Sequence, residues 1–113
     1  MNSPTSRNNY VIAAKVYLEM RGYTIIELNW HRSRSRIDIV AQKAEVIYFV
    51  EVKYFDNDYS GEVDALTKSK LESLHRAAEA WLEENKWHGR HAFAIIEISG
   101  KTLSVMSFTD NVI

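Results

Sequence analysis

Two stretches of the chain repeat apolar residues at helical spacing. Gly22 follows the first stretch, residues 10–21, at the place where a left-handed helix cap belongs. The residues predicted to face inward are Ala13, Val16, Tyr17 and Met20 in the first stretch, and Leu71, Leu74, Ala78, Trp81 and Leu82 in the second, residues 66–85. The pattern therefore predicts two amphipathic helices.

Five further stretches are rich in β-branched and aromatic residues, which is typical of strands. They cover residues 23–28, 36–42, 45–54, 92–98 and 102–108. The second and third are so close that they predict a hairpin, while polar residues 56–62 predict a solvated loop. The predicted order is α-β-β-β-α-β-β, an α/β fold with a central mixed sheet flanked by helices.

Asp38, Glu51 and Lys53 interrupt the two strands of this hairpin, which otherwise consist mostly of apolar residues. Side chains of a strand alternate between its faces, so Glu51 and Lys53 share a face. A two-residue turn at Lys43-Ala44 would pair Gln42 with Glu45 and put Asp38 opposite Phe49. Asp38 would then lie one diagonal step from Glu51, on the same face.

Two neighbouring carboxylates repel each other unless a cation lies between them, so Asp38 and Glu51 favour a divalent metal site. Mg²⁺ takes few protein carboxylates and completes its shell with water and phosphate oxygens, which indicates phosphodiester chemistry. We expect either carboxylate to be removable without unfolding the domain, because its loss relieves repulsion. The alternative is an ordinary ion pair between Glu51 and Lys53, with Asp38 capping a turn.

Composition limits the remaining classes of function. With 113 residues, the chain has the size of one domain, predicted over residues 10–113 after a flexible segment, residues 1–9. The absence of cysteine excludes disulfides and thiolate sites, and four scattered histidines argue against zinc. No apolar run is long enough for a membrane span, so we expect a cytoplasmic protein that does not bind membranes.

Positive charge is concentrated in one short segment, although the formal net charge is −1. A near-neutral chain argues against non-specific coating of nucleic acid. However, His31, Arg32, Arg34 and Arg36 fall within six residues directly before the strand of Asp38. The cluster predicts a loop that binds a phosphate backbone, and a merely solvated loop is the alternative.

Several motifs together resemble the YraN-like family, small endonuclease-like proteins of the PD-(D/E)XK superfamily related to archaeal Holliday-junction resolvases. They span about residues 8–98 and include Arg21-Gly22-Tyr23, Ile37-Asp38-Ile39-Val40-Ala41, Phe49-Val50-Glu51-Val52-Lys53, and Lys70 followed by Leu74. The resemblance implies a restriction endonuclease-like fold and a Mg²⁺- or Mn²⁺-dependent nuclease that cuts structured or branched DNA, with a homodimer as one option.

The resemblance also implies roles for individual residues. Asp38, Glu51 and the Val52 carbonyl would hold the metal, Lys53 would assist the attacking water, and Lys70 would lie at the edge of the site. Family acids are replaced by Val11, Arg36 and Ala94, and Arg36 could neutralise the carboxylates in place of a metal. The alternative function is therefore a catalytically impaired module that binds nucleic acid or a protein partner.

Overall fold

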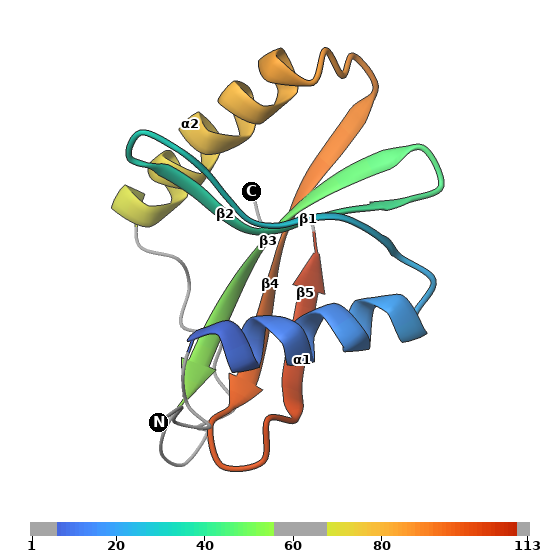
Figure 1. The fold of residues 1–113 in the computed structure, drawn as a ribbon, viewed down its shortest axis with the longest axis vertical. Helices are drawn as coiled ribbons and strands as arrows, with labels where there is room; N and C mark the ends of the chain where they lie inside the picture. Colours follow the sequence, from blue (N-terminus) through green and yellow to red (C-terminus); the bar gives the residue numbers. More distant parts are fainter. Residues whose placement is uncertain (1–6, 56–67, 111–113) are drawn as a thin grey trace.

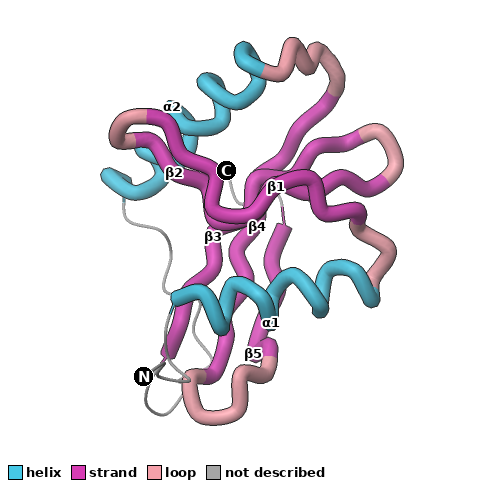
Figure 2. Tube along the Cα trace, in the orientation of Figure 1, coloured by secondary structure: helices cyan, strands magenta, loops and turns pink. Residues whose placement is uncertain are grey.

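The computed structural model describes residues 7–55 and 68–110, which form two helices and five strands (Figure 2). The elements are α1 (Arg7–Met20), β1 (Thr24–Arg32), β2 (Ser35–Lys43), β3 (Val46–Phe55), α2 (Lys68–Glu84), β4 (Arg90–Ser99) and β5 (Val105–Asp110). The predicted order is confirmed, although α1 begins at Arg7, three residues earlier than expected. The loop predicted at residues 56–62 lies outside the described residues.

The five strands form one sheet in the order β1-β2-β3-β4-β5. β3 and β4 run parallel and every other neighbouring pair is antiparallel, so the sheet is mixed, as predicted. A parallel pair needs a crossover connection, and α2 lies on the segment that joins β3 to β4. Figure 1 shows α1 and α2 at different levels along the strongly twisted sheet. None of the described helices is long and apolar enough to cross a membrane.

Each helix covers its own face of the sheet, because successive strand residues point to opposite faces. On the α2 face, Phe49 and Phe93 pack with the helix residues Leu74, Ala77, Ala78 and Trp81. On the α1 face, Val50, Val52, Ala94 and Ile96 pack with Val11, Ala14 and Leu18. The inward face of α2 is therefore largely as predicted.

The inward face predicted for α1 is confirmed for Ala13 and Tyr17, which are half-buried and pack against the core, and is wrong for Val16 and Met20. The fully buried positions are Val11, Ala14 and Leu18, whereas Val16 is 46% exposed and Met20 is 83% exposed. The helix carries apolar residues on two neighbouring stripes, and the stripe with the small Ala14 packs on the sheet. Gly22 does close the helix: its φ is 91°, and the Tyr23 N–H donates to the Leu18 carbonyl at 3.0 Å.

The register predicted for the β2–β3 hairpin is also wrong. Lys43 pairs with Val46 and Gln42 with Ile47, so the turn is Ala44-Glu45, with Ala44 at a φ of 54°. The predicted register would have buried the Asp38 carboxylate against the Phe49 ring, and a buried charge needs polar partners. The observed register places Asp38 one step beyond the last pair, Ile39–Val50, and therefore beside Glu51.

The basic segment is part of a second hairpin, not a loop. His31 pairs with Arg36 and Arg32 pairs with Ser35, so β1 extends to Arg32 and only Ser33-Arg34 forms the turn. Ser33 takes the left-handed conformation that this tight turn requires, with a φ of 55°. The predicted cationic loop is therefore the tip of the β1–β2 hairpin.

Candidate functional site

The centre of the candidate site is the point where β2 leaves β3. Their ladder stops at Ile39–Val50, and the Val52 N–H donates instead to Oδ2 of Asp38, at 2.8 Å. Asp38 is only 1% exposed. Its carboxylate therefore replaces the backbone acceptor that a continuing strand would have provided.

The carbonyl oxygen of Val52 is directed toward the same neighbouring strand, β2, as its N–H. The N–H and C=O of one strand residue point toward the same neighbouring strand, as the double bonds of an antiparallel pair show. Since the Val52 N–H points to Asp38, the Val52 carbonyl also points toward β2. Asp38, Glu51 and Val52, the three predicted metal ligands, thus lie at one place in the fold.

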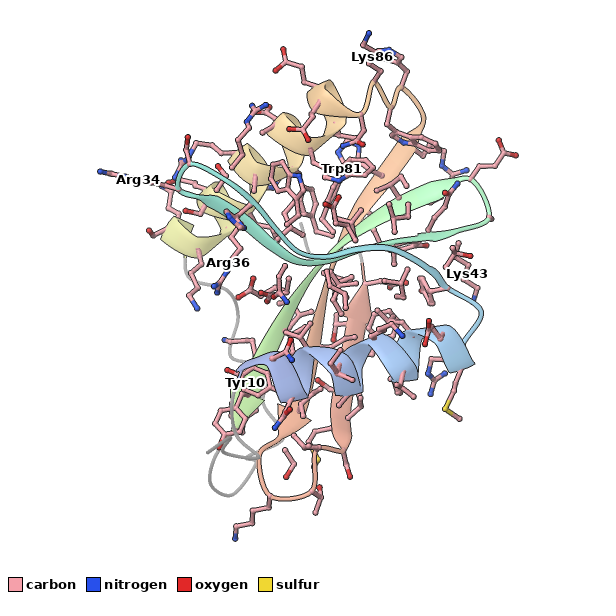
Figure 3. The ribbon with its side chains drawn as sticks, viewed as in Figure 1. Tyr10, Arg34, Arg36, Lys43, Trp81 and Lys86 are labelled. Carbon is pink, nitrogen blue, oxygen red and sulfur yellow. The ribbon has the colours of Figure 1, made fainter. Side chains whose placement is uncertain are left out.

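A cleft of about 210 Å³ opens beside these residues. Its lining comes from the β1–β2 hairpin, β3 and the first turns of α2: Arg34, Arg36, Glu51, Lys70, Ser73 and Leu74. Figure 3 shows Arg34 at the tip of the hairpin, with Arg36 near the beginning of α2. Three of the five predicted nucleic-acid-binding residues, Arg34, Arg36 and Lys70, therefore surround one concave surface together with Glu51.

Arg36 also reaches the buried carboxylate. Its Nε lies 3.9 Å from Oδ1 of Asp38, and its side chain is half exposed. This distance is at the outer limit of an ion pair, so the contact is loose. Arg36 therefore lies between the carboxylate and solvent, where it can turn toward either.

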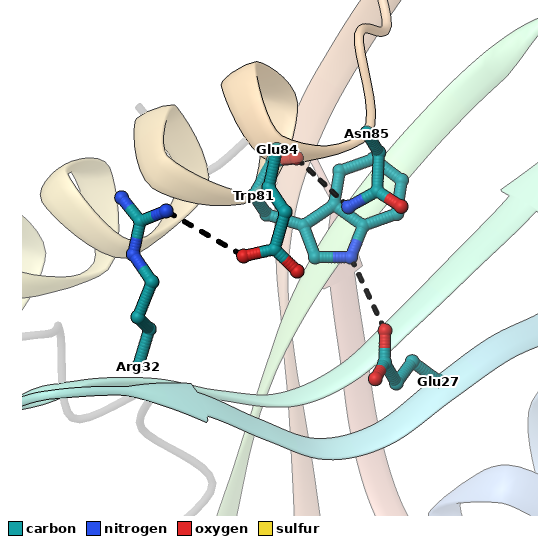
Figure 4. A network of polar contacts seen from close by, with 5 residues as sticks. All are labelled: Glu27, Arg32, Trp81, Glu84 and Asn85. Atoms are coloured by element: carbon teal, nitrogen blue, oxygen red, sulfur yellow. Dashed lines mark hydrogen bonds and ion pairs between the residues drawn. The ribbon is translucent and has the colours of Figure 1, made fainter.

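Arg32 has a different environment from Arg34 and Arg36. Its guanidinium lies 3.5 Å from the Glu84 carboxylate of α2, and the Trp81 indole N–H donates to Glu27 of β1 at 3.4 Å (Figure 4). Both contacts connect β1 to α2, but the Arg32–Glu84 pair is half exposed and therefore contributes little to stability. His31 is exposed and in register with Arg36, but neither His31 nor Arg32 lines the cleft.

Lys53 lies two residues beyond Glu51 on the same face of β3 and does not line the cleft. Its neighbour in the parallel ladder is Glu97 of β4. Glu97 is 0% exposed and accepts a hydrogen bond from the Ser107 hydroxyl of β5. Glu97 was not among the site residues predicted from the sequence, although a lone carboxylate within the apolar run 95–98 is the same signal that singled out Asp38.

The residues at the site fit a hard divalent ion. Within the described ranges, no cluster of three or more histidine, aspartate or glutamate side chains could hold a metal, so the described residues supply two carboxylates at most here. This number suits Mg²⁺, which keeps several waters and takes one or two carboxylates. A carboxylate has about four lone-pair positions, so Asp38 can accept from Val52 and still ligate an ion.

A larger cleft, of about 470 Å³, lies at the opposite end of β3 and contains none of the predicted site residues. Tyr23, Lys43, Arg90 and Asp110 are among its lining residues. Burial raises the pKa of Tyr23, with further contributions from Tyr48 and Asp110, so the phenol stays protonated at neutral pH. The two signs of charge are mixed there, which gives this cleft no preference for a polyanion.

The hydrogen bond to Val52 changes the stability expected for Asp38 variants. Asp38→Ala leaves a buried N–H without its acceptor, which costs about 1–3 kcal/mol. Relief of repulsion with the half-buried Glu51 offsets only part of this loss. Asp38→Asn keeps an acceptor oxygen and should lose less, and urea unfolding measures the difference. Equal midpoints for the two variants would mean that the hydrogen bond does not contribute to stability.

Comparison with known proteins identifies the family. The sequence profile of the uncharacterised protein family UPF0102 matches residues 12–98. A UPF0102 protein of Cytophaga hutchinsonii is 36% identical over 81% of this chain and 82% of its own length. UPF0102 proteins of Vibrio campbellii and Neisseria meningitidis are each 36% identical over 70% and 66% of this chain. Those alignments span 66% and 65% of the relatives' lengths, slightly less than two thirds. The chain belongs to the UPF0102 family.

Proposed function

We propose that the protein is a metal-dependent nuclease that acts on structured or branched DNA, with a restriction endonuclease-like fold. One observation carries the proposal: a cleft lined by three cationic residues lies beside Asp38, Glu51 and the Val52 carbonyl. Carboxylates and cations at one concave surface suit a substrate that brings both phosphate and a divalent ion. The resemblance to the YraN-like endonuclease-like proteins supports the same reaction.

Asp38, Glu51 and the Val52 carbonyl would hold Mg²⁺ or Mn²⁺. Such an ion polarises the phosphate and lowers the pKa of a bound water, which then becomes a nucleophile at neutral pH. Arg34, Arg36 and Lys70 line the cleft and would bind the phosphates of the strand. Lys53 would hold the attacking water or stabilise the charge that develops on the phosphate.

One observation favours a second candidate, a catalytically impaired module that binds nucleic acid or a protein partner. Arg36 lies 3.9 Å from Asp38 and brings a positive charge to the place where the ion would bind. A cation this close to the carboxylate repels a divalent ion, so Arg36 can weaken metal binding without disturbing the cationic cleft. Calorimetric titration with Mg²⁺ and Mn²⁺ separates the two candidates, because the nuclease requires a binding heat and the impaired module does not.

The cleft also predicts how nucleic-acid binding depends on salt. Arg34→Ala should weaken binding of a branched DNA and lower the slope of log affinity against log salt by roughly one unit, because about one counterion is released per phosphate contact. Arg32→Ala is a matched control at the same hairpin, since Arg32 is held by Glu84 and does not line the cleft. Fluorescence anisotropy at several salt concentrations measures both slopes. If Arg32→Ala lowers the salt slope more than Arg34→Ala does, the nucleic acid binds outside the cleft.

A further inference from the structure

Glu97 is a buried charged residue for which the proposed chemistry provides no role. It is 0% exposed and lies in β4 between Ile96 and Ile98, which pack on the α1 side of the sheet. Alternation along the strand therefore points Glu97 to the opposite face. This is the face of Phe49 and Phe93, and also of Glu51 and Lys53 in β3.

Three neighbouring strands contribute one polar row on that face. Lys53 of β3 is the ladder partner of Glu97, and Glu97 is the ladder partner of Ser107 in β5. The Ser107 hydroxyl donates to Oε1 of Glu97. Ladder partners lie about 5 Å apart with their side chains on the same face, so the lysine and the carboxylate are neighbours.

A fully buried carboxylate needs both hydrogen-bond donors and a compensating charge. Ser107 is one donor, but it carries no charge. Lys53 is the cation among the residues that the described strands pair with Glu97. Its aliphatic stem can cover the carboxylate while its ammonium group stays at the edge of the buried region, consistent with the half-buried position of Lys53.

We propose that Glu97 is a positioning residue for Lys53: oriented by Ser107, it fixes the lysine ammonium group on the face that carries Glu51. The function of Lys53 in this inference rests on the proposed nuclease activity, whereas the coupling between the two side chains does not. An ammonium group held by a buried carboxylate has few orientations, so less entropy is lost when it contacts a phosphate or a water.

The test is an NMR measurement on the protein with ¹⁵N-labelled lysines, in the absence of metal and nucleic acid. The Lys53 ammonium signal is assigned by its loss in Lys53→Arg. In the wild type, we expect a high order parameter for this group and a low one for Lys101, an exposed lysine in the β4–β5 turn. In Glu97→Gln, the order parameter of Lys53 should fall to that of Lys101.

Two further variants keep the result interpretable. Glu45→Gln removes the same charge eight residues before Lys53, roughly 26 Å along β3, and should leave Lys53 ordered. Ser107→Ala removes only the hydroxyl that orients Glu97, and should lower the order parameter of Lys53 even if Glu97→Gln does not fold.

The proposal is overturned if Lys53 is as mobile as Lys101 in the wild type, or if Glu97→Gln and Ser107→Ala both leave Lys53 ordered. If the order parameter of Lys53 falls in Glu51→Gln alone, its ammonium group is held by Glu51 and not by Glu97. None of these outcomes depends on cleavage. A protein without nuclease activity can still show the coupling, and an active nuclease can lack it.

Discussion

Glu51→Gln is expected to abolish binding of Mg²⁺ and Mn²⁺, together with any metal-dependent cleavage of branched DNA. The amide removes one of the two carboxylates that the described residues place at the site and leaves Asp38 as the other. Even the loss of an outer partner of a metal ligand costs roughly 10–100-fold in affinity or activity, so the loss of a ligand should cost more than about 100-fold. Calorimetry measures the binding, and gel analysis of a labelled four-way junction measures the cleavage.

Glu45→Gln is the matched control for this experiment. It makes the same chemical change in the β2–β3 turn, at the other end of β3, and should bind metal like the wild type. Equal metal affinity in Glu51→Gln and the wild type would place the ion elsewhere. Absence of metal binding in the wild type would instead favour the impaired binding module and would leave the cationic cleft as its functional surface.

Arg36→Glu is expected to have the opposite effect and to raise the affinity for Mg²⁺ by at least about tenfold. The substitution removes a cation 3.9 Å from the Asp38 carboxylate and introduces an anion there. At about 4 Å, each pair of unit charges contributes of order 1 kcal/mol even in bulk water, so the reversal of charge favours a divalent ion strongly. If Arg36 inhibits the wild type, the variant should also reveal or increase nuclease activity.

Arg34→Glu provides the control for Arg36→Glu. It reverses the same charge in the same cleft, at a residue that lines the cleft and follows the turn residue Ser33. It should therefore weaken nucleic-acid binding while raising metal affinity less than Arg36→Glu. If the wild type already cleaves DNA with Mg²⁺ and Arg36→Glu slows the reaction, Arg36 binds substrate and does not inhibit the enzyme.

Local periodicity was sufficient to predict the types and the order of the elements, because each strand and helix carries its own pattern of apolar residues. It was insufficient where two arrangements satisfy the same pattern. Residues 43–45 allow a turn at Lys43-Ala44 or at Ala44-Glu45. The two registers differ by two residues, so each side chain keeps its face of the sheet in both, and the apolar pattern does not distinguish them. The register of Asp38 therefore depended on which polar partners became available. In α1, two adjacent apolar stripes competed, and packing selected the stripe with Ala14.

The candidate site was predictable to the extent that it lies within one hairpin. Asp38 and Glu51 are brought together by the short β2–β3 turn, and a cluster of arginines is visible in the sequence itself. The position of Lys70 at the cleft depends on how α2 packs on the sheet. The environment of Glu97 was less predictable still, because its donor Ser107 and its neighbour Lys53 come from the strands on either side of β4. The order of strands in the sheet, which no local pattern contains, makes them neighbours.

The hydrogen bond from the Val52 amide to Asp38 makes one backbone amide proton a reporter of changes at the carboxylate. The chemical shift of an amide proton depends on the charge and distance of its acceptor, and its exchange with solvent depends on how often that bond opens. Capture of an ion by Asp38 or departure of the Arg36 guanidinium would each alter the Val52 resonance directly. The Val52 amide is thus a natural NMR probe at the centre of the candidate site, and its chemical shift and exchange rate can be measured without substrate.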